Sequence, residues 1–129
     1  MNKAARQRIW DKSGGRCWYC GCTLPEKGWH ADHVEPIKRK LQYTRAKGLF
    51  TTDECRRPER DTEDNLVPAC ASCNVQKHSL SVEQFREQIQ AYVNSLNQYH
   101  TIYGVAKRYG LVQETGATVR FWFEDHLPD

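Results

Sequence analysis

Residues 29–36 read Trp29-His30-Ala31-Asp32-His33-Val34-Glu35-Pro36, and the rest of the sequence is organised around them. We expect a strand over residues 27–34 that leads into a functional site. Pro36 ends regular pairing, because proline has no backbone N–H to donate to a neighbouring strand. Adjacent strand residues point to opposite faces, so Asp32 and His33 can share a site only where the strand distorts or ends. We expect this stretch to form one half of a metal-dependent site.

Two Cys-x-x-Cys pairs bracket the stretch, with Cys17-Trp18-Tyr19-Cys20 before it and Cys70-Ala71-Ser72-Cys73 after it. A Cys-x-x-Cys turn points both sulfurs at one ion, and two such pairs make the tetrahedral four-thiolate site that is typical of structural zinc. A redox dithiol is the alternative, but the presence of two pairs argues against it. The spacing therefore predicts a zinc site that joins the two halves of the chain.

The composition is that of an ordinary globular protein. A chain of 129 residues fits one domain, and 39% hydrophobic with 27% charged residues excludes a disordered or membrane protein. No apolar run reaches the length of a transmembrane helix, and the first residues lack the apolar segment of a secretory signal. We expect a cytoplasmic protein, encoded by a bacterium or a phage. In that compartment cysteines favour metal binding over disulfides, and Cys22 and Cys55, outside the two pairs, are expected as free thiols. A competing role of Cys22 at the ion stays open.

Four segments have helical patterns. Residues 2–13 form the first, and residues 71–78 begin the second directly after the second cysteine pair. The third opens at Ser81 with Gln84 three residues on, which is a capping box. The fourth covers residues 101–109. The third helix carries an apolar stripe at helical spacing that we expect in the core: Val82, Phe85, Ile89, Tyr92, Val93 and Leu96.

Two segments have weaker patterns. Residues 38–64 have little apolar periodicity and are expected to form a long loop, with a helical turn near residues 41–46. The loop is either a solvated run of charge or a surface that contacts a phosphate backbone. Residues 111–124 alternate in a way that predicts a β-hairpin turning at residues 114–117. The first part of the loop holds five basic residues and no acid: Lys38, Arg39, Lys40, Arg45 and Lys47.

Several polar side chains match the needs of phosphodiester hydrolysis. This reaction requires a base that activates water, a cation that stabilises charge on the phosphate, and groups that position the backbone. His33 suits the first role, and a divalent ion on hard oxygen ligands suits the second. Asp32 and Asn74 can supply such oxygens. Asn65 has an amide that can bond to a loop backbone.

Together these motifs resemble the HNH endonucleases of the four-cysteine zinc type. The resemblance covers about residues 8–78 and rests on Cys17-x-x-Cys20, Asp32-His33-Val34-x-Pro36, Asp64-Asn65-Leu66-Val67-Pro68 and Cys70-x-x-Cys73-Asn74-x-x-Lys77. It implies a ββα-metal core around one catalytic divalent ion, with zinc joining the loops. It also implies cleavage to 5′-phosphate and 3′-hydroxyl ends without a covalent intermediate.

The resemblance assigns roles by position. His33 becomes the general base, Asp32 and Asn74 the ligands of the divalent ion, and Asn65 the middle residue that shapes the loop. Lys77 is expected to approach the phosphate. Asparagine stands at the third motif position in place of the histidine in the motif's name, and this favours Mg²⁺ or Mn²⁺ over zinc at that site.

The expected fold is therefore α+β. It consists of a small ββα-metal core with a four-cysteine zinc knuckle pair, flanking helices and a C-terminal β-hairpin, in one domain over residues 1–129 with an extension at 79–129. DNA is the expected partner, with no membrane or small-molecule ligand. His30 is either an extra ligand or phosphate contact, or a partly exposed strand histidine. The residues expected to contact DNA are Lys38, Arg39, Lys40 and His78.

Other functions remain open at this point. A zinc-ribbon module that binds DNA without cutting it would keep all four cysteines, but it would leave Asp32, His33 and Asn74 without a role. An RNase or a toxin nuclease would share the chemistry but act on another target.

Overall fold

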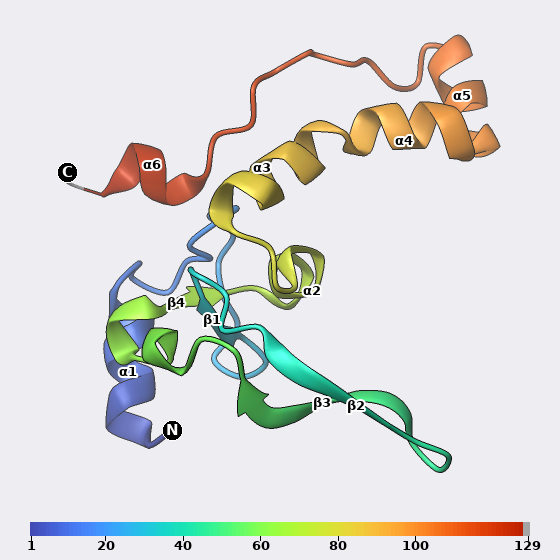
Figure 1. Ribbon diagram of the computed structural model, residues 1–129. Coiled ribbons are helices and arrows are strands. Elements are labelled where there is room, and N and C mark those ends of the chain that lie inside the picture. The colour runs from blue at the N-terminus through green and yellow to red at the C-terminus, as the bar shows by residue number, and fades with distance from the viewer. Residues whose placement is uncertain (128–129) are drawn as a thin grey trace.

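A computed structural model describes residues 1–127 of the chain, which contain both helices and short strands (Figure 1). The strands are β1 (His30–His33), β2 (Arg39–Thr44), β3 (Gly48–Cys55) and β4 (Leu66–Ala69). The α-helices are α1 (Lys3–Asp11), α2 (Ala71–Lys77), α3 (Val82–Gln90), α4 (Tyr92–Tyr99), α5 (Thr101–Arg108) and α6 (Trp122–His126). Short 3-10 turns cover Pro58–Arg60 and Glu63–Asn65. No helix among these is long and apolar enough to cross a membrane.

The centre of the fold is an antiparallel pair of strands followed by a helix. β1 pairs with β4 from His30 opposite Ala69 to His33 opposite Leu66. α2 starts two residues after β4, with Cys70 as its N-cap. Every residue of β4 is buried. The carbonyl of Pro68 accepts a 2.8 Å hydrogen bond from Trp18, which ties this strand to the first cysteine turn. The expected α+β fold with a ββα core is confirmed.

The core beside this unit is aromatic. Tyr19 meets Phe85 and Phe121 edge to face, with each pair of ring centroids 5.6 Å apart. Phe85 and Phe121 stack at 5.5 Å. All three rings are buried. The first cysteine turn, α3 and the C-terminal segment are therefore held together by one cluster of rings.

The C-terminal β-hairpin predicted at residues 111–124 is wrong. The chain instead runs extended from the end of α5 back to the core and forms α6 (Figure 1). Its backbone pairs with the first cysteine turn, because Trp122 N–H donates to the Tyr19 carbonyl at 2.8 Å and Phe123 N–H to the Trp18 carbonyl at 3.1 Å. The aromatic alternation thus serves packing against the first cysteine turn.

The long third helix is divided. α3 ends at Gln90, and α4 starts at Tyr92 and leads into α5 away from the core (Figure 1). The capping box of Ser81 and Gln84 is present as predicted. Phe85 is buried, but Val93 is 42% exposed. The apolar stripe is therefore core only in its first half, because α4 extends beyond the surface that α3 packs against.

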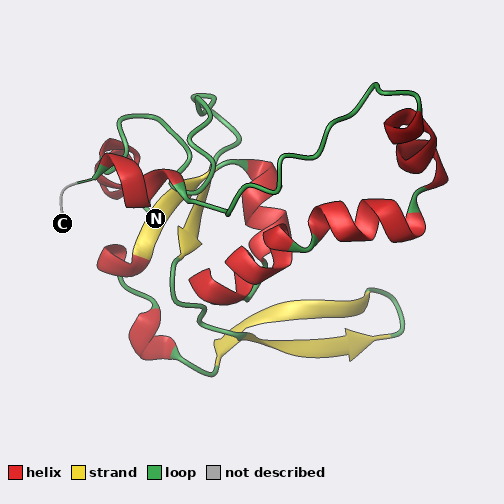
Figure 2. Cartoon of the chain, turned by 90° about the horizontal axis from the view of Figure 1, so that it is seen from above, coloured by secondary structure: helices red, strands yellow, loops and turns green. Residues whose placement is uncertain are grey.

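The loop and helical turn predicted within residues 38–64 are also wrong. β2 and β3 form a β-hairpin that is a separate two-stranded sheet (Figure 2). Thr44 pairs with Gly48, and Gly48 has a φ of 70°, which glycine adopts without strain. The two 3-10 turns follow. Apolar alternation in the sequence of this hairpin is confined to Leu41 and Tyr43, whereas Leu49 and Phe50 in β3 are adjacent.

Candidate active site and metal centre

The four cysteines of the two predicted pairs come together. The Sγ atoms of Cys17, Cys20, Cys70 and Cys73 all lie within 4.8 Å of one another. Thiolates about 2.3 Å from a tetrahedral zinc ion stand roughly 3.8 Å apart, and the Cys20–Cys70 Sγ separation is 3.8 Å. The neighbouring Cys73 thiol lowers the pKa of the Cys17 thiol. The donor set and its spacing fit structural zinc.

Local backbone contacts shape this centre. Gly21 N–H donates to the Cys17 carbonyl, which closes the first turn, and Gly21 has a φ of 76°. A Cβ at Gly21 would meet the Trp122 ring at 2.4 Å, so only glycine fits. The Sγ of Cys70 accepts from the N–H of Cys73 as an N-cap of α2. The four-cysteine cluster and the start of α2 are therefore built as one unit.

The two remaining cysteines differ in position. Cys22 is exposed and Cys55 half-buried, and neither forms a disulfide within residues 1–127. Burial raises the pKa of the Cys22 thiol. The Cys22 carbonyl accepts a 2.9 Å hydrogen bond from Cys17 N–H, so Cys22 lies next to the four-cysteine cluster.

Asp32 is held in place from two sides. Its carboxylate is only 6% exposed, and Oδ2 accepts a 2.6 Å hydrogen bond from the Tyr19 hydroxyl. The Lys77 ammonium lies 3.1 Å from the same oxygen and donates a 2.7 Å hydrogen bond to the His33 carbonyl. Burial, and then the charge of Asp32, raise the pKa of Tyr19, so the hydroxyl stays a donor. Asp32 therefore has one fixed orientation.

The position of Lys77 differs from the expectation that it approaches a phosphate. Its side chain is fully buried under β1. A buried ammonium needs an ionic partner, and Asp32 satisfies it. Lys77 fixes the carboxylate and the end of β1, and its ammonium has no path to a substrate at the surface.

His33 faces another acid. Its Nε2 lies 2.8 Å from Oδ1 of Asp61, and the His33 side chain is 19% exposed. Asp61 follows the turn Pro58–Arg60, a region without clear sequence pattern. The fold therefore places a carboxylate behind the imidazole, which the sequence motifs did not indicate.

Asn65 joins two loops, as its predicted contact with loop backbone requires. Its amide accepts from Glu35 N–H at 2.9 Å and donates to the Glu35 carbonyl at 2.8 Å. It also donates to the Arg60 carbonyl at 2.7 Å. Since Asp61 is the next residue, Asn65 holds the loop that carries the partner of His33.

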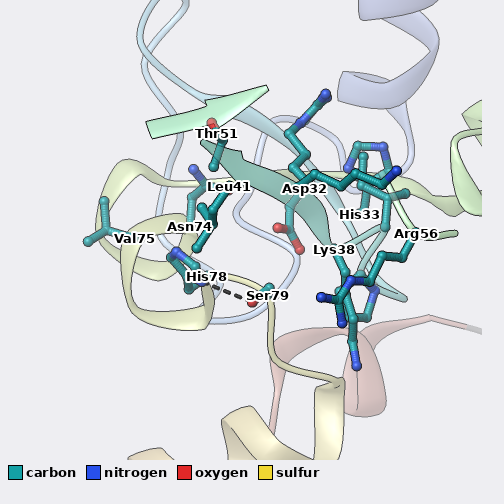
Figure 3. A pocket seen from close by; sticks show the side chains of 15 residues that line it. Asp32, His33, Lys38, Leu41, Thr51, Arg56, Asn74, Val75, His78 and Ser79 are labelled. Atoms are coloured by element: carbon teal, nitrogen blue, oxygen red, sulfur yellow. Dashed lines mark hydrogen bonds between the residues drawn. The ribbon is translucent and has the colours of Figure 1, made fainter. Parts of the chain in front are cut away.

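One pocket of about 1040 Å³ unites most of the predicted site. Asp32 projects into it between Asn74 and His78 on one side and His33 on the other (Figure 3). Lys38, Arg39 and Lys40 line its rim, as does Arg56, which the sequence analysis had not singled out. Asn65 supports the wall from behind. His30 is exposed and is not among the lining residues.

Three contributors were missed from the sequence. Tyr19 lies inside the first cysteine turn, and the sequence motifs assigned it no role. Asp61 and Arg56 lay in a mixed-charge segment that offered no spacing signal. No local pattern could have found them, because each acts through a partner more than ten residues away or across the hairpin.

Comparison with known proteins agrees with the motif. Residues 54–80 match the family model for HNH endonuclease. Among solved structures the chain is similar to the Type II-C Cas9 enzyme from Actinomyces naeslundii, with a TM-score of 0.44 and 20% identity over 66% of this chain. The chain spans 7% of the length of that protein. None of the curated proteins compared with the chain matches it. Residues 54–80, which carry Asn65, Asn74 and the second cysteine pair, therefore match the family that the motifs resemble.

Proposed function

We propose that this protein is a metal-dependent HNH endonuclease that hydrolyses DNA phosphodiester bonds to 5′-phosphate and 3′-hydroxyl ends. One observation carries the proposal: the carboxylate of Asp32, the imidazole of His33 and the amide of Asn74 line a single open pocket. Basic side chains surround the same pocket, which suits a polyanionic substrate. The nuclease class agrees with the match at residues 54–80.

His33 is the general base in this proposal. With Nε2 paired to Asp61, the neutral imidazole carries its proton on that nitrogen, and Nδ1 keeps a lone pair that accepts a proton from water. Asp61 orients the ring and stabilises the imidazolium that forms. Asn65 holds the backbone next to Asp61. Asn65 and Asp61 are therefore positioning residues.

Asp32 and Asn74 hold the divalent ion. Carboxylate and amide oxygens are hard donors that fit Mg²⁺ or Mn²⁺. A bound ion of this kind stabilises negative charge on the phosphate and the leaving oxygen. Tyr19 and Lys77 both meet Oδ2 of Asp32, which leaves Oδ1 as the donor toward the pocket. Lys77 acts here as a positioning residue. The DNA backbone is bound by Lys38, Arg39, Lys40, Arg56 and His78.

The domain boundaries follow from the same proposal. The motif core covers about residues 8–78, and the extension at 79–129 belongs to the same single domain because Phe85 and Phe121 pack on Tyr19. Residues 128 and 129 lie outside the described residues.

A plasmid assay tests the nuclease function. Supercoiled plasmid is incubated with Mg²⁺ or Mn²⁺ and either the unaltered protein or His33→Ala. We expect cleavage with either ion, and a loss of about 10²- to 10⁴-fold in rate for the variant, as is typical when a general base is removed. His30→Ala is the matched control, because His30 lies on the same strand but outside the pocket.

Two results would reject the nuclease. The first is that neither ion supports cleavage. The second is that His33→Ala cleaves as fast as the unaltered protein. Salt-dependent DNA binding without cleavage under any metal would instead favour a zinc-ribbon binding module. Mapping the cut ends on plasmid DNA shows whether one or both strands are cut.

A further inference from the structure

The β2–β3 hairpin exposes apolar side chains that the fold leaves uncovered. Leu41 is 59% exposed, Tyr43 70% and Leu49 68%. The two strands form a sheet of their own. A two-stranded hairpin by itself is marginally stable in water, and clustered exposed apolar side chains mark interaction surfaces. The hairpin therefore has the features of a surface that a partner covers.

The apolar surface is continuous with the candidate active site. Leu41 pairs with Thr51, and Tyr43 pairs with Leu49. Alternate residues and cross-strand partners share one face of a hairpin, so these four side chains form a single strip. Leu41 and Thr51 also line the pocket that holds Asp32 (Figure 3). The strip thus starts at the pocket and leads toward the hairpin tip.

The length of the strip matches a few nucleotides. Strand residues rise about 3.3 Å each, so the Tyr43–Leu49 pair stands roughly 7 Å beyond the Leu41–Thr51 pair. Stacked bases of one DNA strand are about 3.4 Å apart. If a phosphate binds at Asp32 and His33, only the base steps next to that phosphate can therefore contact the strip.

The charge of the hairpin identifies the partner. Between residues 38 and 52 there is no acidic residue. Lys38, Arg39 and Lys40 stand at the base of the hairpin, and Arg45 and Lys47 at its tip. Two basic clusters thus flank the apolar strip. Lys40 already lies 3.4 Å from Glu54 on the neighbouring strand. Phosphates on both sides of an unstacked base step would meet the other basic side chains, whereas an apolar protein surface would offer them no counter-charge.

We infer that the hairpin is a duplex-DNA wedge, in which Tyr43 and Leu49 press between base steps beside the scissile phosphate while the flanking cations bind the backbone. A two-stranded ribbon is narrow enough for a DNA groove, and apolar side chains inserted at a base step unstack it. This inference rests on the proposed function, because it places the scissile phosphate in the pocket.

The test measures binding without cleavage. His33→Ala protein is mixed with a labelled DNA duplex, and fluorescence anisotropy gives Kd over a range of salt concentrations. The second variant adds Tyr43→Thr and Leu49→Thr, since threonine keeps the strand preference and removes most of the apolar surface. We expect Kd to rise at least about tenfold, the size of one lost base contact, with an unchanged salt slope. The matched control adds Tyr99→Thr and Leu111→Thr, which are also exposed but lie outside the hairpin.

A second readout separates a wedge from simple adhesion. 2-Aminopurine in the duplex gains fluorescence when it is unstacked. We expect this gain with His33→Ala protein and its loss on adding Tyr43→Thr and Leu49→Thr. Adding Arg45→Ala and Lys47→Ala instead should reduce the salt slope by about one for each lost phosphate contact.

The outcomes distinguish the wedge from the nuclease. If the unaltered protein cuts plasmid but the threonine variant binds duplex as tightly as its parent, the wedge is wrong and the nuclease stands. If the hairpin is needed for binding but no metal supports cleavage, the nuclease is wrong and the wedge stands. The wedge is overturned if the His33→Ala parent does not bind duplex DNA. It is also overturned if the strip binds only single-stranded DNA.

Discussion

At the scale of single residues, the site depends on a carboxylate that is both buried and charged. Asp32 is reached by the Tyr19 hydroxyl and the Lys77 ammonium on one oxygen. Removing Lys77 would leave this carboxylate without its cation in a place that solvent hardly reaches. The burial of the charged Asp32 carboxylate therefore both makes the site rigid and costs stability.

Lys77→Met provides a test of this ion pair. The substitution keeps the apolar stem but leaves Asp32 without its cation, and we expect a loss of about 3–5 kcal/mol in the free energy of unfolding. Urea unfolding of zinc-loaded protein gives the value. Lys3→Met, on the first turn of α1, is the control for a lysine that is exposed. An unfolding free energy equal to that of the unaltered protein would show that the pair is not required.

Asp61 is the residue whose role the fold alone reveals. Asp61→Asn keeps the size of the side chain but can present N–H to His33 and favour the wrong tautomer. We expect cleavage to fall by about 10- to 100-fold, as for other partners that orient a catalytic group, with KM little changed. Glu59→Gln is the matched control, since Glu59 is exposed nearby and pairs with Arg57. Equal rates for Asp61→Asn and the control would remove Asp61 from the proposal.

At the scale of elements, the C-terminal segment behaves as a clamp on the first cysteine turn. The N–H groups of the first two residues of α6 donate to the carbonyls of Tyr19 and Trp18, and the Phe121 ring closes the aromatic cluster. The Arg86 guanidinium lies 4.8 Å from the centre of the Phe121 ring and joins α3 to the same place. Residues far from the motif thus support the four-cysteine cluster.

Phe121→Ala tests the clamp. The ring is 2% exposed, and its loss leaves a cavity between Tyr19 and Phe85, so we expect about 3–5 kcal/mol of destabilisation. Thermal unfolding with zinc present gives the measurement. Ile102→Ala, at 86% exposure on α5, should change stability by less than about 0.5 kcal/mol. Equal effects of the two substitutions would mean that the clamp contributes nothing.

At the scale of the whole molecule, the four-cysteine cluster connects the parts of the chain. Cys17 and Cys20 belong to the turn after α1, and Cys70 and Cys73 to the start of α2. The strands β1 and β4 lie between these turns and pair with each other. Holding the turns together therefore also holds Asp32 on β1 near Asn74 on α2.

Metal removal tests this connection. We expect about one tightly bound zinc per chain by elemental analysis, and loss of folded structure by circular dichroism when a chelator is added or Cys70 is changed to serine. Cys55→Ser should keep both zinc and structure. Cys22→Ser examines whether the neighbouring thiol competes for the ion. Folded protein without zinc would contradict a structural role of the metal.

The sequence by itself determined the parts whose geometry is local or imposed by chemistry. The Cys-x-x-Cys spacing predicted the thiolate cluster because a tetrahedral ion requires that spacing. Glycine and capping signals predicted α1, α5 and the start of α3 because helix ends are satisfied by nearby residues. The motif around Asp32, His33 and Asn74 predicted that these side chains share a site.

Only the tertiary structure decided the rest. The alternation around Phe121 predicted one strand of a hairpin, but in the structure this segment packs into the aromatic cluster. The β2–β3 hairpin had no buried face, and the alternation of Leu41 and Tyr43 was too short to indicate a strand by itself. Lys77 is buried and His33 meets Asp61 because segments distant in sequence converge on β1. Such pairings depend on which surfaces remain free once the core has formed. The spacing of residues within one segment therefore cannot predict them.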